Sequence, residues 1–422
     1  MNAATLIDQT ELREYLESFS LNQETVLFNG FENKTEIEFI EINGKRYPKF
    51  INEYWTSKQR QASSLHEIAY RACFKGQLPR FFIKLLTEEN DIVYDPFSGR
   101  GTTVIEAALL NRNIISNDIN PLSQILTLPR VSIPSIEEIE KRISEIPIHQ
   151  TAKANLDLSM FYHPKTEAEI VSLKNYLKDR RETGQEDRID SWIRMTATNR
   201  LTGHSPGFFS VYTLPPNQAV SPESQKRINQ KRKQTPAYKD TKKLIIKKSR
   251  LLTRHISEQQ KKQLSEIASH ALFLTKDARK TSEIAGESIQ LTVTSPPFLD
   301  VVQYADDNWL RCWFNSIDVA EVEQNITMKK SLDDWRATMG DMFKELYRIT
   351  RSGGWVAFEV GEVRNGKIKL DEHVVPLGIE AGFHCEGIMI NRQTFTKTSN
   401  IWGVNNNAKG TNTNRIVIFR KD

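Results

Sequence analysis

The stretch from Asp91 to Thr103 reads DIVYDPFSGRGTT, and it decides the fold. Its first residues form an apolar strand pattern that a proline ends. Gly99 and Gly101 then allow positive φ angles and a close backbone approach to a ligand. Because a helical pattern follows from Val104 to Leu110, the stretch predicts a strand, a glycine-rich turn and a helix. The spacing G-x-G-T-T lacks the lysine of a phosphate loop, which argues against an NTPase.

A second strand pattern runs from Asn113 to Asn117 and ends in Asp118. Asp118 follows the glycines by about 20 residues, the spacing at which an acidic side chain meets ribose hydroxyls in dinucleotide-binding folds. It could also act as a helix cap or a turn former. Together with the glycine loop, Asp118 favours ribose binding.

A third strand pattern, Ile289 to Val293, leads into Thr294-Ser295-Pro296-Pro297-Phe298. The two prolines make a stiff loop at the carboxyl end of the strand, the edge of an open α/β sheet where ligands bind. The loop offers the hydroxyl of Ser295, the carbonyl of Pro296 and the ring face of Phe298. These groups suit a planar base bearing an exocyclic amine, although such a motif by itself is also consistent with an ordinary loop.

The two motifs together resemble the S-adenosylmethionine-dependent DNA amino-methyltransferases. The resemblance covers the segment before the glycine loop, the loop itself and everything from about Phe273 to the end. The Ser-Pro-Pro form is similar to the N4-cytosine branch of that family. The resemblance implies an α/β fold, with a Rossmann-like sheet and helices on both faces. It also implies S-adenosylmethionine as the cofactor and double-stranded DNA as the substrate.

The resemblance further implies which residues bind the cofactor. The segment from Phe74 to Pro79 resembles the part that packs on the methionine half, although it also fits an ordinary helix start. Asp277 resembles the acid that reaches the adenine amine, and it fits a helix cap equally well. The implied cofactor-binding set is Phe74, Gln77, Asp95, Pro96, Phe97, Gly99, Gly101, Thr102, Thr103, Asp118, Asn120, Asp277 and Thr294.

The expected catalytic residues are Ser295, Pro296, Pro297 and Phe298. A cytosine amine is a poor nucleophile inside the duplex, so the base must be flipped into a pocket. There Ser295 and the Pro296 carbonyl would accept hydrogen bonds from the amine, and Phe298 would stack on the base. Phe298 replaces the tyrosine more usual in the family but keeps the stacking surface. Because no cysteine follows a proline in such a loop, the covalent route to 5-methylcytosine is disfavoured.

A basic block lies between Ser221 and Lys262, with 14 Lys and Arg against 3 Asp and Glu, whereas the whole chain carries a net charge of +5. Such a block suits phosphate neutralisation, or it could be a solvated arm. The expected DNA-binding residues are Lys226, Arg227, Lys231, Arg232, Lys233, Lys242, Lys243, Lys247 and Lys248.

The composition limits the other possibilities. The three cysteines of the 422-residue chain form no CxxC pair, so neither a zinc site nor a disulfide framework is expected, and the compartment should be reducing. No signal segment or membrane-length apolar run is visible. We therefore expect a cytoplasmic, nucleoid-associated protein without a membrane partner, which is a monomer or a weak homodimer.

Four segments are expected. Residues 1–54 form an amino-terminal appendage, and residues 55–125 the first part of the methyltransferase domain. Residues 126–268 form an inserted target-recognition region, and residues 269–422 carry the catalytic motif. An insertion at this place departs from the commonest layout of the family.

Two other functions remain open. The chain could methylate adenine or an RNA amine, or it could be a catalytically silent nucleic-acid-binding subunit. The leading expectation is a DNA N4-cytosine methyltransferase of a restriction–modification system, with a cognate endonuclease as its partner.

Overall fold

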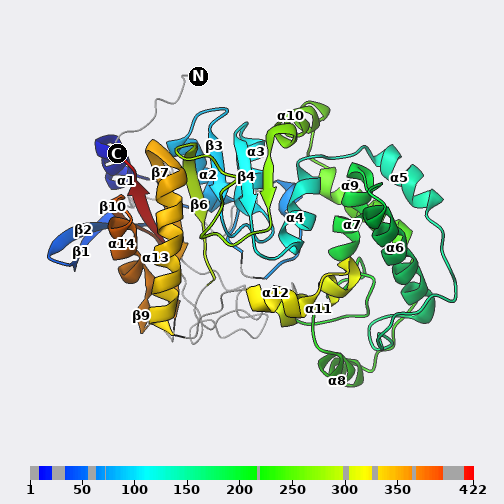
Figure 1. Ribbon diagram of the computed structural model, residues 1–422. Helices are drawn as coiled ribbons and strands as arrows, with labels where there is room; N and C mark the ends of the chain where they lie inside the picture. Colours follow the sequence, from blue (N-terminus) through cyan, green and yellow to red (C-terminus); the bar gives the residue numbers. More distant parts are fainter. Residues whose placement is uncertain are drawn as a thin grey trace, which may run out of the picture.

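The computed structural model describes residues 9–20, 34–55, 63–71, 73–215, 219–297, 304–325, 331–363, 367–392 and 413–422. Nine of the described strands form one mixed sheet with helices on both faces (Figure 1). In spatial order they are β1 (Glu36–Ile42), β2 (Lys45–Asn52), β10 (His384–Arg392), β11 (Thr413–Arg420), β7 (Thr350–Val360), β6 (Ile289–Thr294), β3 (Ile92–Asp95), β4 (Asn113–Asn117) and β5 (Leu272–Leu274). The predicted strands of the two motifs are therefore confirmed.

The five strands from β7 to β5 are parallel. β11 runs antiparallel between β7 and β10, and β2 joins β10 in parallel. The chain passes from β3 outward through β4 to β5, and then returns to β6 and moves the other way to β7. The direction of winding thus reverses between β3 and β6, which is where open α/β sheets bind their ligands.

Successive residues of the central strands pack into two different cores. Val93, Leu291 and Ala357 belong to one hydrophobic cluster. Tyr94 follows Val93 in the chain and Phe358 follows Ala357, yet both belong to a second hydrophobic cluster. Because side chains alternate along a strand, the sheet is buried on both faces, and this explains the near-continuous apolar runs of the sequence.

Helices cover each of these faces. α2 (Gln77–Leu86) and α3 (Thr102–Leu109) pack in the first cluster, whereas α13 (Leu332–Ile349) and α14 (Leu370–Glu380) pack in the second. The remaining helices are α1 (Gln9–Ser18), α4 (Leu122–Thr127), α5 (Ile136–Glu145), α6 (Pro164–Glu182), α7 (Arg188–Thr198), α8 (Pro222–Arg232), α9 (Thr241–Thr253), α10 (Glu258–His270), α11 (Tyr304–Asn315), α12 (Val319–Asn325) and the 3-10 turns η1 (Ser64–His66) and η2 (Leu128–Arg130). β8 (Glu362–Val363) and β9 (Ile368–Lys369) form a separate small hairpin.

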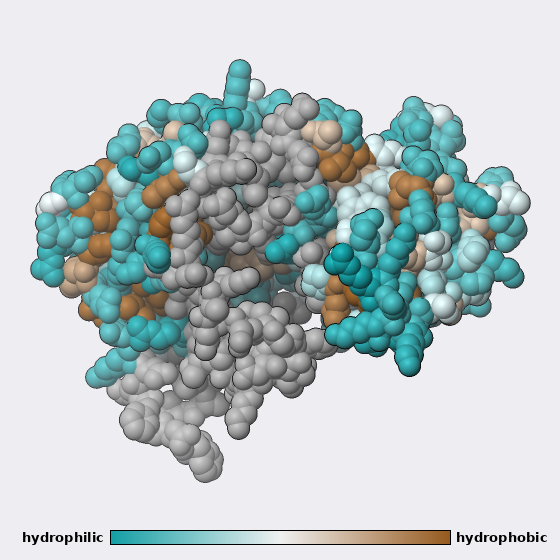
Figure 2. All heavy atoms as spheres, turned by 90° about the horizontal axis from the view of Figure 1, so that it is seen from below, coloured by the Kyte–Doolittle hydropathy of each residue, from teal (hydrophilic) through white to brown (hydrophobic). Residues whose placement is uncertain are grey.

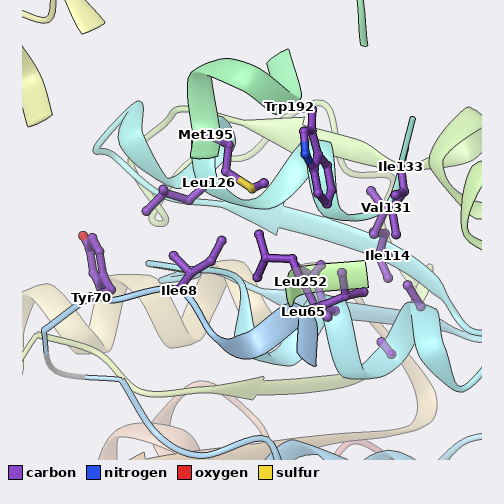
Figure 3. Packing of buried hydrophobic residues seen from close by; sticks show 14 of the residues in the cluster. Leu65, Ile68, Tyr70, Ile114, Leu126, Val131, Ile133, Trp192, Met195 and Leu252 are labelled. Carbon is purple, nitrogen blue, oxygen red and sulfur yellow. The ribbon is translucent and has the colours of Figure 1, made fainter. Parts of the chain in front are cut away.

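The helical region between β4 and β5 shares a core with the sheet. Trp192 and Met195 of α7 are buried together with Leu126 of α4, Leu252 of α9 and Ile114 of β4 (Figure 3). Capping boxes at Ser135, Asp187 and Ser257 fix where α5, α7 and α10 begin. The helical region is therefore packed on the sheet and is not held by a tether alone.

The segment predicted as an appendage extends the sheet. Asn43 and Gly44 both have positive φ, 51° and 75°, and connect β1 to β2 as the hairpin pattern predicts. In the described part of the chain, no helix has the length and apolar character needed to cross a membrane.

Candidate functional site

A cavity of about 860 Å³ opens at the carboxyl edge of the parallel strands. Its walls come from the loops that follow four strands: Pro96, Phe97 and Gly99 after β3, Asp118, Ile119 and Asn120 after β4, Lys276 to Arg279 after β5, and Ser295 and Pro297 after β6. Tyr70 and the α13 residues Thr338, Met339 and Met342 complete it. The cavity thus lies at the reversal of the winding direction and brings the two sequence motifs together.

The side chain of Asp118 is hydrogen-bonded to the backbone of the glycine loop. Its carboxylate accepts hydrogen bonds from the backbone N–H of Gly99 at 2.8 Å and of Asn120 at 2.9 Å. Burial raises the pKa of the Asp118 carboxyl to about 6, although both N–H groups act in the opposite direction. Each oxygen keeps a further lone pair, so the carboxylate can accept bonds from hydroxyls of a ligand in the cavity.

Asp95 joins the two motifs from beneath the cavity. It is fully buried, and its Oδ1 accepts a hydrogen bond from Thr294 Oγ1 at 2.6 Å and one from the Phe97 N–H at 3.1 Å. Thr103 strengthens the junction, since its hydroxyl donates to the Val293 carbonyl at 3.0 Å. Burial raises the pKa of Asp95 to about 7. These residues hold the strands in register and do not line the cavity.

The Ser-Pro-Pro loop is held from both sides. The indole Nε1 of Trp335 donates to the Pro297 carbonyl at 3.0 Å, and the Ser295 hydroxyl lies near the carboxylate of Glu359 and lowers its pKa. Pro296 is buried, whereas Ser295 and Pro297 line the cavity. Phe298 lies outside the described residues.

Glu359 lies beside Ser295, and the sequence interpretation did not single it out. It lies near the end of β7, and Asn414 of β11 donates to its Oε1 at 3.0 Å. Burial raises the pKa of the Glu359 carboxyl, and the bonds from Ser295 and Asn414 lower it. The signal was present, because an acid interrupts the apolar strand pattern WVAFEV at the edge of the sheet where ligands bind.

The remaining predicted cofactor residues fall into two groups. Asp277 lines the cavity, and Arg279 pairs with its carboxylate at 2.6 Å, which lowers the pKa of Asp277. Six others do not line it: Phe74, Gln77, Asp95, Gly101, Thr102 and Thr103, the last three at the start of α3. Thr294 and Pro296 also lie behind the wall. Tyr70, which the sequence interpretation did not single out, lines the cavity.

The basic block divides between two helices. Lys226, Arg227, Lys231, Arg232 and Lys233 are exposed on α8 and at its end. On α9, by contrast, Lys248 is buried and its Nζ donates to the Glu67 carbonyl at 2.6 Å, and Lys242 donates to the Ile146 carbonyl at 2.7 Å. Lys243 and Lys247 remain exposed there. Lys248, one of the expected DNA-binding residues, is therefore buried and bonded to the backbone at Glu67 instead of lying on the surface.

The two helices lie in different places relative to the cavity. α8 projects at the lower side of the molecule, where α11 and α12 also lie, whereas α9 is higher in the helical region (Figure 1). Seen from below, the side chains over α8 form a strongly hydrophilic surface (Figure 2). Among the described residues, no group of three or more His, Cys, Asp or Glu side chains is arranged to hold a metal ion.

Comparisons with known proteins give matches to methyltransferases. A family model described as DNA methylase matches residues 11–124. The type II methyltransferase M.BsoBI of Geobacillus stearothermophilus is 24% identical over 341 residues, which cover 73% of this chain and 65% of that protein. The orphan methyltransferase M.BamHII of Bacillus amyloliquefaciens is 44% identical over 62 residues, 14% of this chain and 23% of that protein. The chain therefore spans less than two thirds of the length of these relatives.

Solved structures give weaker matches. A DNA modification methylase of Thermus thermophilus, complexed with S-adenosyl-L-methionine, aligns with a TM-score of 0.22 at 17% identity over 34% of this chain and 53% of its own. An rRNA methyltransferase of Streptomyces viridochromogenes aligns with a TM-score of 0.33 at 10% identity over 85% and 90%. Scores this low carry no conclusion about activity. The matching family model is described as DNA methylase and these sequence relatives are named as type II or orphan methyltransferases, and those descriptions do not distinguish cytosine N4 from adenine N6.

Proposed function

We propose that this protein transfers a methyl group from S-adenosylmethionine to the N4 amine of a cytosine flipped out of double-stranded DNA. The observation that supports the proposal most strongly is the convergence of the glycine loop, Asp118 and the Ser295 loop on one cavity. We further propose that the helical region between β4 and β5 recognises the target site. The type II relatives favour a role beside an endonuclease that cuts the same site.

The residues around the cavity fit the cofactor. Asp118 would accept bonds from the ribose hydroxyls, and Asp277 would accept one from the adenine amine. Gly99 lets the backbone of the loop approach the cofactor closely, because it has no side chain and can adopt a φ of 51°, in the left-handed region. When bound, S-adenosylmethionine supplies an electrophilic methyl group on a sulfonium.

Ser295 and Glu359 would act on the target amine as a pair. The Ser295 hydroxyl, which lowers the pKa of Glu359, would donate its proton to that carboxylate and leave its oxygen to accept a hydrogen bond from the amine. The Pro296 carbonyl would accept the second amine hydrogen, so that the nitrogen lone pair points at the methyl group. When the nitrogen gains the methyl group it must lose a proton, and Glu359 can receive that proton through the Ser295 hydroxyl. The raised pKa of Glu359 makes it a better base for this step.

The choice of cytosine rests on the serine at the first position of the loop. Ser295 offers one hydroxyl in place of an amide or a carboxylate, which is similar to the N4-cytosine branch. Methylation of adenine or of RNA, and a silent binding subunit, are the alternatives that the experiments below separate.

Cofactor affinity should depend on pH through Asp118. Its pKa of about 6 means that the carboxylate is ionised at pH 7.5 and mostly protonated at pH 5. A protonated carboxyl loses acceptor capacity for the ribose hydroxyls, so affinity should fall by on the order of tenfold between those pH values. Isothermal titration of S-adenosylhomocysteine, the demethylated product, measures this. Asp118→Asn should bind weakly with a flat profile over the same range, and an unchanged slope in that variant would assign the titration to another group.

The α8 surface should set the salt dependence of DNA binding. Arg227 and Lys231 are exposed one turn apart on α8, and each phosphate contact contributes about 0.9 to the slope of log affinity against log salt. Arg227→Ala with Lys231→Ala should therefore lower that slope by about 1–2 in fluorescence-anisotropy titrations of a duplex. Lys243→Ala with Lys247→Ala, a matched pair on α9, should leave it unchanged. An equal decrease of the slope in both double variants would indicate that α8 and α9 both contribute to the DNA-binding surface.

Transfer of a labelled methyl group tests the proposed reaction. S-adenosylmethionine with a tritiated methyl would be incubated with the protein and, separately, with duplex DNA, single-stranded DNA and ribosomal RNA. Label should enter duplex DNA of mixed sequence with the wild-type protein and stay near background with Ser295→Ala. Incorporation into RNA alone would overturn the choice of substrate. No incorporation into any of the three, together with normal DNA binding, would identify a silent subunit.

A further inference from the structure

Tyr70 closes the cavity over the glycine loop. A side-chain carbon placed on Gly99 would lie 3.4 Å from the Cε1 atom of the Tyr70 ring, so the ring packs directly on the loop. Tyr70 is 5% exposed and lines the cavity. It lies at one end of the core cluster shared with the helical region, on the opposite side from Trp192 (Figure 3). A ligand in the cavity would therefore touch a residue that is continuous with that cluster.

The backbone around Tyr70 is held by the helical region and by α11. The Ala69 carbonyl accepts hydrogen bonds from Arg311 Nη2 of α11 at 3.0 Å and from Asn199 Nδ2 at 3.2 Å. On the other side, Arg71 Nη1 donates to both carboxylate oxygens of Asp307, each at 2.8 Å. The Asp307 side chain is 5% exposed, so Arg71 is the cation that compensates a buried charge on α11.

α11 has two further connections. It begins at Tyr304, the first described residue after the Ser-Pro-Pro loop. It also holds the segment that leads into α8: the Asp307 carbonyl accepts from the Ala219 N–H at 2.9 Å, and Trp309 Nε1 donates to the Val220 carbonyl at 3.2 Å. Ser221, the next residue, caps α8. The Asp307 side chain is thus bonded to Arg71, the neighbour of the cavity residue Tyr70. Its backbone carbonyl is bonded to Ala219, in the segment that leads into α8.

We propose that the Arg71–Asp307 ion pair couples the cofactor cavity to the DNA-binding helix, so that cofactor and DNA each strengthen the binding of the other. A cofactor that packs on Tyr70 restrains residues 69–71, the ion pair transmits that restraint to α11, and α11 fixes the start of α8. Arg71 and Asp307 are positioning residues, since neither lines the cavity. By linkage, the factor by which the cofactor tightens DNA binding must equal the factor by which DNA tightens cofactor binding. This inference rests on the proposed function.

The test compares DNA affinity with and without S-adenosylhomocysteine. The dissociation constant of a duplex would be measured by anisotropy, and that of S-adenosylhomocysteine by calorimetry, for wild-type protein, Arg71→Ala and Asp307→Asn. In the wild type, saturating S-adenosylhomocysteine should tighten DNA binding by about tenfold. In both variants the ratio should fall to about twofold or less, with each separate affinity within about threefold of wild type. Asp307→Asn keeps the size of the side chain, so it answers the question if Arg71→Ala folds poorly.

Arg188→Ala is the matched control, because Arg188 is also half-exposed and ion-paired, with Glu138 of α5. It should keep the wild-type ratio. A wild-type ratio near one in a protein that binds both ligands would overturn the coupling and leave the proposed function intact. So would an unchanged ratio in both variants. A wild-type protein that binds neither ligand would overturn the proposed function itself.

Discussion

Replacing Ser295 by alanine should lower turnover by about two to three orders of magnitude while leaving cofactor and duplex binding within about threefold of wild type. Ser295 lies on the cavity wall, where its hydroxyl would meet the proposed target amine, and its loss would remove both the orienting acceptor and the proposed path to Glu359. Neither role affects binding before the reaction. Single-turnover methylation, with separate measurement of the two dissociation constants, checks the prediction. A tenfold loss or less would show that the loop does not carry the chemistry.

Glu359→Gln is the companion variant that separates the two roles. An amide can still accept a hydrogen bond from Ser295 but cannot receive a proton at neutral pH. If Glu359 accepts the proton, single-turnover rates in the wild type should fall at acidic pH, where the carboxyl is protonated, and the variant should lose that dependence together with much of its rate. A variant with wild-type rate and an unchanged profile would leave Glu359 a role in positioning only.

Replacing Gly101 by alanine should destabilise the protein by about 2–4 kcal/mol and abolish cofactor binding. Gly101 has a φ of 74°, in the left-handed region, and a Cβ there would lie 2.4 Å from both Cγ2 and Oγ1 of Thr127. Thr127 is fully buried and has little room to retreat, so the glycine loop must shift. Chemical denaturation and calorimetric titration of S-adenosylhomocysteine measure the two effects.

Gly353→Ala isolates the backbone contribution. Gly353 has nearly the same φ, 72°, but a Cβ there would meet no atom within 4 Å. It should therefore cost only the left-handed penalty, about 1–2 kcal/mol, and keep cofactor binding. An equal loss of stability in both glycine variants would mean that the contact with Thr127 is relieved at no cost, and would contradict a destabilising effect of close packing at Gly101.

The sheet was largely predictable from sequence because its strands are buried on both faces. Ile289 to Thr294 is apolar or β-branched at nearly every position, and all six residues are buried. Prolines and glycines mark where such strands end, so the loops at the ligand-binding edge could be placed as well. The convergence of those loops follows from the rule that ligands bind where the winding direction reverses.

Contacts between distant segments were not predictable in the same way. Tyr70 looks like any aromatic residue before a helix, and only the packing of residues 69–71 against α11 brings it over Gly99. Lys248 illustrates the opposite case, since a signal existed. It follows Ile245 by three residues and precedes Leu252 by four, so helical spacing places it on the buried face of α9. The count of charges took no account of this helical spacing and therefore placed Lys248 on the surface.

Nucleoside mass spectrometry shows directly whether the protein methylates cytosine at N4. DNA from cells that express the wild-type chain would be hydrolysed and compared with DNA from cells that express Ser295→Ala. The account predicts N4-methylcytosine in the first sample and none in the second. N6-methyladenine in the first sample would contradict the assignment of the base while keeping the fold and the cofactor, and the absence of any methylated base that depends on Ser295 would contradict the proposed reaction.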